Sequence, residues 1–529
     1  MQATRRTLLT AGIALATTLT VATSAMAQPA VAELKIGLSS EPSSLDPHFA
    51  AIAANLALSS HFFDALVNVD PAGAYVPGLA LSWVQIDATT FEFKLRPGVK
   101  FHDGSAFTVE DVVFSLERPA KVLNSPGPFT SYTKMIASMQ VVNPLTLRIK
   151  TSEPYAPLIG DLSSVYIVSH KAAAAATTGD FNSGKALLGT GPFRFTAYKR
   201  GESVTMARNA DYWGEKAAFE KVTARIITSD PARLAALLSG DVDMIESVPP
   251  ADMPKLKADA KFAVKQRATW RTLFLQLNHA AADNSPNFTD KSGTPLQHNP
   301  LKDVRVREAL SKGLNRQALV KVALDGFAMP AAQLIGIGLV GYNAEAKVEA
   351  YDPEGARKLL TEAGYPNGFA ITLAAPNNRY INDDEVAQAV AQLWSRIGIQ
   401  AKVVTMPMAT YVPKMRNGEF GTALLGWGTM GADFGLRTLL GSIDPAKGWG
   451  GWNWGKYSNP KLDELVMGAL TAPNAAKRQE TAQQAMALAM RDYAALPTHY
   501  QLATWGMRAN LDYAGRIDEF TFAHQVKSK

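Results

Sequence analysis

The sequence predicts a mixed α/β protein with more than one domain. Segments that alternate apolar and polar residues, as half-buried strands do, are interspersed with segments of helical spacing, which is typical of α/β lobes. At 529 residues the chain exceeds the usual size of one domain. Hydrophobic residues make up 47% of it and charged residues 19%, an ordinary globular balance that can bury large cores. No internal repeat or long low-complexity segment breaks this pattern.

The expected strands follow from alternation and from short apolar runs. Residues 91–96 alternate strictly, Pro97-Gly98 predicts a turn, and residues 99–101 are expected to resume the strand. The remaining expected strands are 34–38, 145–150, 222–227, 273–278, 369–374 and 400–404.

The expected helices follow from start signals, stop signals and spacing. Thr108 predicts an N-cap, because Glu110 and Asp111 follow it in the first turn, where acidic side chains complement the helix dipole. Residues 281–300 are polar and rich in Asn, Pro and Asp, and they are expected to form a loop. The remaining expected helices are 171–179, 231–238, 304–314, 353–363 and 383–397.

Residues 1–27 are predicted to be an export signal that is cleaved after Ala27. Arg5 and Arg6 precede an apolar, Thr-rich stretch, and Ala25-Met26-Ala27 is a small-x-small cleavage motif. The threonines and the cleavage motif argue against a membrane anchor. The arginine pair resembles a twin-arginine signal, but Sec signals also carry such pairs, so the export route stays open. We therefore expect a periplasmic protein.

The composition excludes several classes of site. The chain has no cysteine, which excludes disulfides, thiolate metal sites, thiol catalysis and a lipid on an N-terminal Cys. The protein is therefore expected not to be lipid-anchored. The formal net charge of +6 is spread thinly, without a run of five like charges, so no nucleic-acid partner is expected.

The sequence contains partial catalytic and cofactor motifs, but their neighbouring residues do not fit those functions. Gly179–Lys185 nearly spells a phosphate-binding loop, but Ala186 stands where a hydroxyl must reach magnesium. Gly336, Gly338 and Gly341 spell GxGxxG, but no strand and helix flank them as a dinucleotide site requires. The eight histidines are scattered, and no GxSxG elbow is present. We expect no cofactor, no built-in metal site and no enzyme.

One stretch carries a specific resemblance. Residues 77–80, 82–83, 91–104 and 107–116 closely resemble the hallmark segment of the family 5 solute-binding proteins, the peptide, dipeptide, oligopeptide and nickel type that serves ABC importers. Further blocks agree in order along essentially all of the mature chain. These blocks are residues 44–47, 189–193, 208–209, 212–214, 240–243, 304–310 and 457–460.

The resemblance implies a two-lobed clamshell of the periplasmic-binding-protein type (cluster C), with an extra subdomain in lobe I. Ligand would be enclosed in a cleft between the lobes, and closure would follow by population shift. The implied division is 28–60, 188–270 and 499–529 for lobe I, 61–187 for the extra subdomain and 271–498 for lobe II.

The resemblance also implies ligand contacts. An aspartate after a Gly-Trp pair holds the ligand's amino group in peptide binders, and here Asp433 follows Gly426-Trp427 after a longer gap than in the dipeptide type. An arginine before a long helix takes the carboxylate, and here this is Arg379. For both residues the alternative is ordinary structure, a helix cap and a surface arginine.

Aromatic and backbone contacts complete the implied site. Ser40 and Glu41 match a segment whose backbone pairs with an extended peptide, Tyr132 matches a pocket-lining position, and Trp427 would form a wall. Trp449, Trp452 and Trp454 lie among glycines and could stack on ligand or simply anchor their loop.

These features together predict a monomeric binding protein that captures a peptide or peptide-like solute and delivers it to an inner-membrane ABC permease. An opine-like, sugar-containing or metal-chelate solute is an alternative within the family. From other classes, an exported hydrolase and a scaffold that binds no small molecule stay open.

Overall fold

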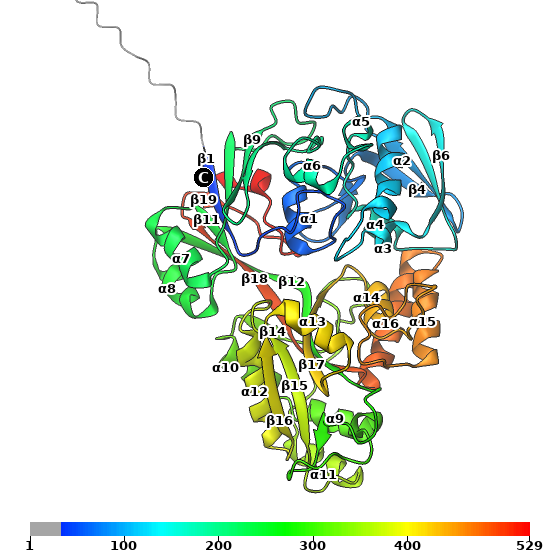
Figure 1. The fold of residues 1–529 in the computed structure, drawn as a ribbon, viewed down its shortest axis with the longest axis vertical. Coiled ribbons are helices and arrows are strands. Elements are labelled where there is room, and N and C mark those ends of the chain that lie inside the picture. The colour runs from blue at the N-terminus through cyan, green and yellow to red at the C-terminus, as the bar shows by residue number, and fades with distance from the viewer. Residues whose placement is uncertain (1–32) are drawn as a thin grey trace, which may run out of the picture.

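The computed structural model describes residues 33–529, which form two lobes stacked end to end with a waist between them (Figure 1). The predicted signal segment, residues 1–27, lies outside the described residues. Among the described residues, no helix is both long and apolar enough to cross a membrane.

One 12-stranded sheet runs through both lobes. Its path is β13-β15-β17-β12-β18-β11-β1-β10-β9-β8, with β14 paired to β18 and β16 paired to β15. Strands of lobe I are β1 (Glu33–Leu38), β8 (Phe193–Lys199), β9 (Ser203–Arg208), β10 (Lys221–Ile226) and β11 (Met244–Glu246). Strands of lobe II are β13 (Phe288–Thr289), β14 (Ala328–Pro330), β15 (Ala370–Pro376), β16 (Gln400–Met406) and β17 (Thr422–Gly428).

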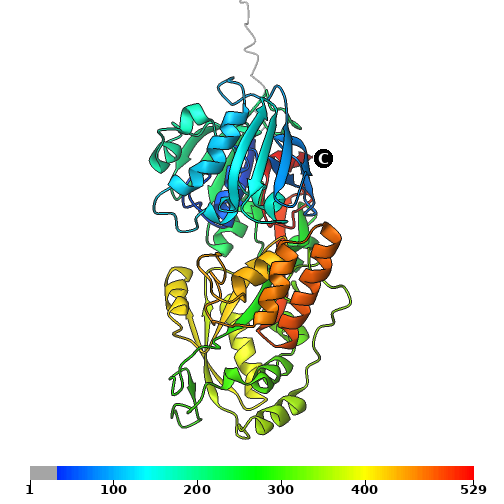
Figure 2. The same ribbon diagram turned by 90° about the vertical axis from the view of Figure 1, so that its right-hand side faces the viewer.

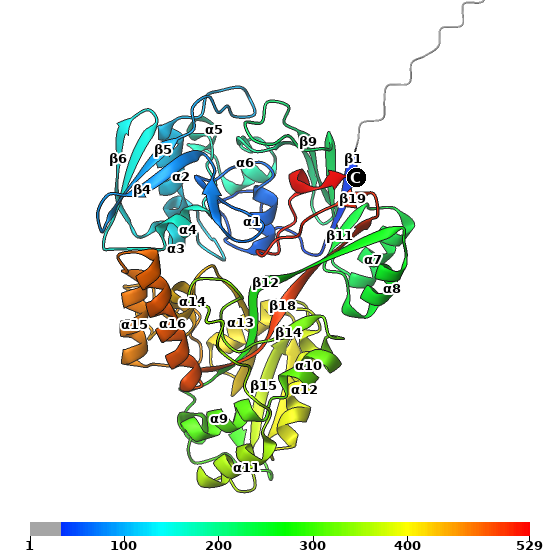
Figure 3. The same cartoon turned by 180° about the vertical axis from the view of Figure 1, so that it is seen from behind.

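Two long antiparallel strands connect the lobes. Strands β12 (Phe262–Leu277) and β18 (Ala495–Arg508) pass through the waist side by side (Figures 1 and 3). Their pairing shifts register between Ala268 and Thr272 and again between Leu273 and Phe274. The predicted boundary between lobes at residues 270 and 271 lies within the first register shift. The predicted boundary at residues 498 and 499 lies within the second. In this description, lobe I comprises residues 33–268 and 502–529, and lobe II comprises residues 272–500.

The extra subdomain of lobe I is built on a separate four-stranded sheet, order β4-β5-β7-β6, seen face-on in Figure 2. Phe93, Leu147 and Ile149 bury one face of its central strands. Its strands are β2 (Val67–Val69), β3 (Tyr75–Pro77), β4 (Ala80–Gln85), β5 (Thr90–Leu95), β6 (Ile136–Asn143) and β7 (Thr146–Thr151). Its helices are α2 (Val109–Glu117), α3 (Thr130–Thr133), α4 (Leu158–Leu162), α5 (His170–Ala173) and α6 (Thr178–Asn182), with α1 (Ala53–Ser59) just before it.

Helices cover the remaining faces of the large sheet. In lobe I they are α7 (Asp230–Ser239) and α8 (Met253–Ala258). In lobe II they are α9 (Val304–Lys312), α10 (Arg316–Ala323), α11 (Pro353–Glu362), α12 (Asp383–Ser395), α13 (Met408–Arg416), α14 (Ala432–Leu439), α15 (Pro460–Leu470) and α16 (Ala475–Arg491). Short 3₁₀ turns at Arg118–Lys121, Pro250–Asp252, Pro300–Lys302 and Ala523–Gln525, and a small pair of β19 (Leu511–Asp512) and β20 (Lys527–Ser528), complete the fold.

Most expected elements are confirmed, two are wrong, and the loop expected at 281–300 also contains the short strand β13. Residues 99–101 form no strand, because after the turn at Gly98 the chain makes only a single bridge between Lys100 and Ala106. The helix expected at 171–179 is split into α5 and α6. Thr177 and Asp180 form a capping box that starts the second helix there.

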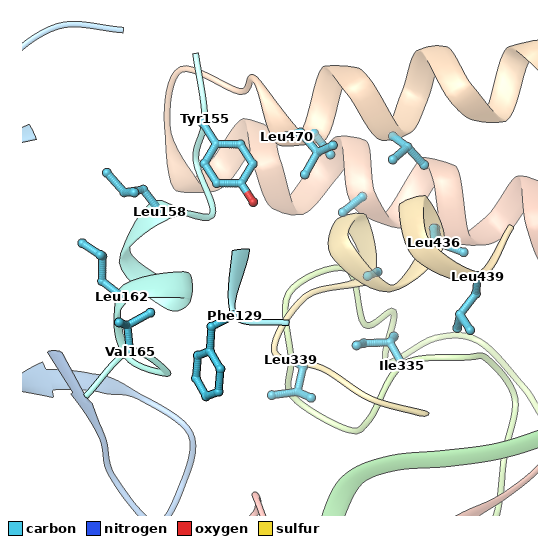
Figure 4. Close-up of a cluster of buried hydrophobic side chains, with 14 of the residues drawn as sticks. Phe129, Tyr155, Leu158, Leu162, Val165, Ile335, Leu339, Leu436, Leu439 and Leu470 are labelled. Atoms are coloured by element: carbon cyan, nitrogen blue, oxygen red, sulfur yellow. The ribbon is translucent and has the colours of Figure 1, made fainter. Parts of the chain in front are cut away.

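The lobes also touch along one flank, away from the connecting strands. Side chains of the extra subdomain, among them Phe129 and Leu162, share one buried cluster with Leu436 and Leu439 of α14 and with Leu470 (Figure 4). The backbone N–H of Ala156 donates to the carbonyl of Leu470 across this seam at 2.8 Å. The structure therefore shows the lobes closed against each other on this side.

Candidate ligand-binding cleft

A cavity of about 370 Å³ lies between the lobes. Lobe I supplies most of its wall, from α1, the β2–β3 hairpin, α3, α4 and the C-terminal segment 516–525. Lobe II closes it with residues 428–431, at the end of β17, and with Phe434 and Arg478. A site of this kind, enclosed by two lobes, suits the capture of a small molecule.

Backbone geometry brings lobe II close to the waist. A Cβ at Gly428, the last residue of β17, would lie 2.5 Å from the indole Nε1 of Trp270, so any larger residue there would have to displace this ring. The chain then lines the cavity through residues 429–431 before α14 begins at Ala432. The 428–431 segment thus exposes main-chain groups to the cavity.

Asp64, a buried polar group of the lobe I wall, already has hydrogen-bond partners. Burial raises the pKa of Asp64, but its carboxylate accepts from Thr190 (2.7 Å), Tyr212 (3.0 Å) and Trp213 (2.9 Å). Arg516 and Asp518 likewise form a buried ion pair at 2.5 Å. These groups hold the wall together and leave little capacity for a ligand.

Three other polar groups on the wall have unused capacity. Among the described residues, Trp270 Nε1 and His524 Nδ1 are buried without a hydrogen-bond partner. Within residues 33–529, the carboxylate of Asp161 in α4 accepts only the hydroxyl of Tyr155, at 2.7 Å on Oδ2. Burial raises the pKa of Asp161 to about 7, against the lowering effect of Tyr155, Arg437 and Arg478.

On the lobe II side of the cavity, Arg478 is held in place by a buried aspartate. Arg478 donates from Nε to Oδ2 of Asp433 at 2.6 Å and from Nη2 to Oδ1 at 3.1 Å. Asp433 is fully buried, and its Oδ1 also accepts the backbone N–H of Phe434. Arg478 lines the cavity, whereas Asp433 stands behind it.

The predicted site residues do not all meet at the cavity. Tyr132 lines it, and burial raises the pKa of this tyrosine to about 12. Asp433 reaches it only through Arg478. Arg379 is exposed beside the waist, with its guanidinium 5.3 Å above the ring of Tyr380 and its pKa lowered chiefly by the charge of Arg271.

The other predicted contacts lie off the wall of this cavity. Ser40 lines a separate small hollow of about 30 Å³. Glu41 accepts from the hydroxyl of Tyr198 (2.9 Å) and the backbone of Gly201 (2.7 Å).

Trp427 packs against Trp452, with ring centroids 5.4 Å apart. Trp449 and Trp454 are buried, and Arg416 lies 5.8 Å and 5.7 Å from the rings of Trp452 and Trp454. The loop that carries these tryptophans also contacts lobe I, where Lys134 donates to the carbonyl of Lys447 at 3.3 Å.

Sequence reasoning missed Asp161, Arg478 and the C-terminal wall. No local pattern marks Asp161, which sits in a short helix of ordinary composition, and Arg478 acquires its role from a partner 45 residues away. These residues can be recognised as one site only from contacts in the folded chain.

A metal-binding cluster is absent from residues 33–529. No group of three or more histidine or acidic side chains there could hold a metal ion.

Comparison with known proteins identifies the family. The family model described as "Bacterial extracellular solute-binding proteins, family 5 Middle" matches residues 74–442. The chain is 29% identical over 448 residues to the dipeptide-binding protein of Escherichia coli, covering 79% of each chain. It is 29% identical over 457 residues to the glutathione-binding protein GsiB of Pectobacterium atrosepticum, covering 84% of each.

A solved structure extends the similarity to the fold. The periplasmic binding protein DppA of Helicobacter pylori, in complex with the peptide STSA, superposes with a TM-score of 0.77 at 25% identity, covering 94% of this chain and 98% of that one. Together with the two lobes and the cavity between them, these matches show that the chain belongs to the family 5 bacterial extracellular solute-binding proteins.

Proposed function

We propose that this protein is the periplasmic substrate-binding component of an ABC importer, and that it captures a peptide or peptide-like solute for a membrane permease. The observation that carries this proposal is the cavity enclosed by both lobes in a chain of this family. A binder needs such an enclosure and no catalytic group, so we propose that the protein is not an enzyme.

The character of the cavity favours a peptide over a purely apolar solute. Its wall combines aromatic side chains, exposed main chain at 428–431 and two opposite charges, Asp161 from lobe I and Arg478 from lobe II. Peptides carry an ammonium, a carboxylate and main-chain hydrogen-bonding groups, which these features complement. The similar proteins whose names mention a dipeptide, glutathione and a bound tetrapeptide support the same cargo class.

We propose that capture works by bending at β12 and β18. The register shifts near Thr272 and Phe274 interrupt the ladder where the strands pass between the lobes. Because a solute contacts Arg478 and the lobe I wall together only in the closed form, binding would shift the population toward closure. Tyr132 would then contact the solute directly, and Arg379 would approach the cleft from the waist.

Calorimetry on the mature protein tests this function. We expect at least one of three probes, Ala-Ala, Ser-Thr-Ser-Ala or glutathione, to bind and to be recovered unchanged afterwards. Ser163→Phe should lower the affinity more than tenfold, because Ser163 lines the cavity and a phenyl ring would fill it. Ser183→Phe makes the same change at an exposed position and should bind as the wild type does.

Failure of all three probes would contradict the peptide assignment. Cleavage of a probe would contradict the binding-protein assignment and favour a hydrolase.

A further inference from the structure

We propose that Asp161, and not Asp433, is the carboxylate that receives the cationic amino group of the solute. This inference rests on the peptide assignment made above. It concerns which of two buried aspartates near the cavity is available for a ligand.

Asp433 is enclosed and keeps little hydrogen-bonding capacity. Its two oxygens take two hydrogen bonds from Arg478 and a third from the backbone of Phe434. The side chain is 0% exposed and does not line the cavity. A ligand ammonium would have to displace Arg478, leaving a partly buried guanidinium without its counter-ion, which is costly. Asp433 is therefore a positioning residue that fixes Arg478.

Asp161 has the opposite character. It lines the cavity, yet among residues 33–529 only Tyr155 donates to its carboxylate, and that bond uses Oδ2. A carboxylate can accept about four hydrogen bonds, so Oδ1 keeps most of its capacity. Buried charges are normally paired, and the missing donors point to a ligand cation.

Two guanidinium groups lie near Asp161, but among the described residues neither donates a hydrogen bond to its carboxylate. Arg478 is neutralised by Asp433, and Arg437 of α14 lies beside the Tyr155 hydroxyl, with no carboxylate of the described residues within 4 Å of it. The effect of burial on the pKa of Asp161 exceeds the opposite effect of the two arginines, because this pKa is raised to about 7. The titratable and charged groups that face Asp161 are Tyr75, Tyr132, Lys134 and Tyr155 in lobe I and Asp433, Arg437 and Arg478 in lobe II.

Aromatic rings complete the subsite. The Tyr75 hydroxyl lies 2.4 Å from where a Cβ of Gly160 would stand, so glycine before Asp161 lets this ring pack closely against α4. Tyr75, Tyr132 and Phe434 all line the cavity. A ring face near a carboxylate favours an ammonium group through cation–π attraction.

The test removes the ammonium group of the ligand and the carboxylate of Asp161 separately. Ala-Ala, Ser-Thr-Ser-Ala and glutathione are each titrated as the free amine and as the N-acetyl form. Wild-type protein should bind the free amine at least tenfold more tightly than its acetylated counterpart. Asp161→Asn should weaken the free amine at least tenfold, leave the acetylated probe within about twofold, and so lose the discrimination. If the ligand ammonium contacts Asp161, the effects of acetylation and of Asp161→Asn are not additive, because either change removes the same contact. A merely structural defect would weaken the free and the acetylated probe alike.

Two further variants sharpen the result. Asp433→Asn should weaken the free and acetylated probes together, because it loosens Arg478. Asp87→Asn makes the same change in an exposed turn between β4 and β5 and should leave both affinities unchanged.

The proposal is overturned if Asp161→Asn still discriminates between the two forms, or if Asp433→Asn alone abolishes the discrimination; the peptide assignment would survive either result. Failure of the wild type to bind any probe would end the peptide assignment and this proposal with it.

Discussion

Asp161 and Asp433 lie near the same cavity but differ in how their charges are satisfied. Asp433 has an ion pair and a backbone donor, so its burial is compensated. Asp161 has one tyrosine hydroxyl, and burial raises its pKa. Carboxylates left uncompensated in this way weaken a fold, and they gather at functional sites.

The pH dependence of stability should reveal Asp161. Its folded-state pKa of about 7 is above the ordinary 3.8, so the native protein holds this proton more tightly than the unfolded chain. The stability contributed by protonated Asp161 is therefore present below about pH 4 and is lost as the pH rises through about 7.

We expect Asp161→Asn to melt a few degrees above the wild type at pH 8, with the difference shrinking toward pH 5. Thermal unfolding followed by circular dichroism across this range measures it without any ligand. Parallel pH profiles for the two proteins would show that Asp161 is not an uncompensated carboxyl.

At this scale the resemblance to a family predicted Asp433 and Tyr132 as ligand contacts. It could not reveal that Asp433 is paired with Arg478, or that Asp161 of α4 lies in the cavity wall. Both facts depend on contacts between distant segments that meet only in the folded chain.

Helix α2 shows which elements local chemistry can specify. Thr108 and Asp111 form the reciprocal capping box that the Thr-x-x-Asp spacing indicates. Asp111 also accepts the backbone N–H of His170, so the cap ties α2 to α5. By contrast, α5 and α6 were expected as one helix, because the alanine run concealed the cap that starts at Thr177.

Removing the α2 cap should loosen that helix locally. Thr108→Ala deletes one hydrogen-bonding partner of the box, and we expect a cost of about 1 kcal/mol. Hydrogen exchange followed by mass spectrometry should show faster exchange of the first-turn amides of α2, while those of α12 in lobe II are unchanged. Thr108→Ser keeps the hydroxyl and should restore protection; equal exchange in all three proteins would refute the role of the cap.

Across the whole molecule, closure involves two separate places. The strands β12 and β18 join the lobes, and the apolar seam around Leu436, Leu439 and Leu470 packs them together on one flank. Family resemblance anticipated the two lobes. It gave no indication of the seam, because side chains from residues 129 to 470 must assemble to form it.

A disulfide across the seam should lock the closed form. The Ala156 N–H to Leu470 carbonyl hydrogen bond brings the two backbones within the range that a disulfide spans. The chain has no cysteine of its own, so Ala156→Cys with Leu470→Cys introduces one defined pair. We expect the oxidised double variant to keep a compact radius of gyration in small-angle scattering and to exchange bound peptide much more slowly.

Reduction should restore exchange, and the single variant Ala156→Cys should behave as the wild type does. Unchanged exchange in a fully oxidised sample would show that the seam does not move during binding.

The most direct test of the central claim is native mass spectrometry of the protein purified from the periplasm, followed by denaturation and identification of the released solute. The account predicts a co-purified peptide of two to several residues, whose amino group is free. Release of a sugar, an opine-like molecule or a metal chelate instead would contradict the peptide assignment while leaving the family and the fold intact.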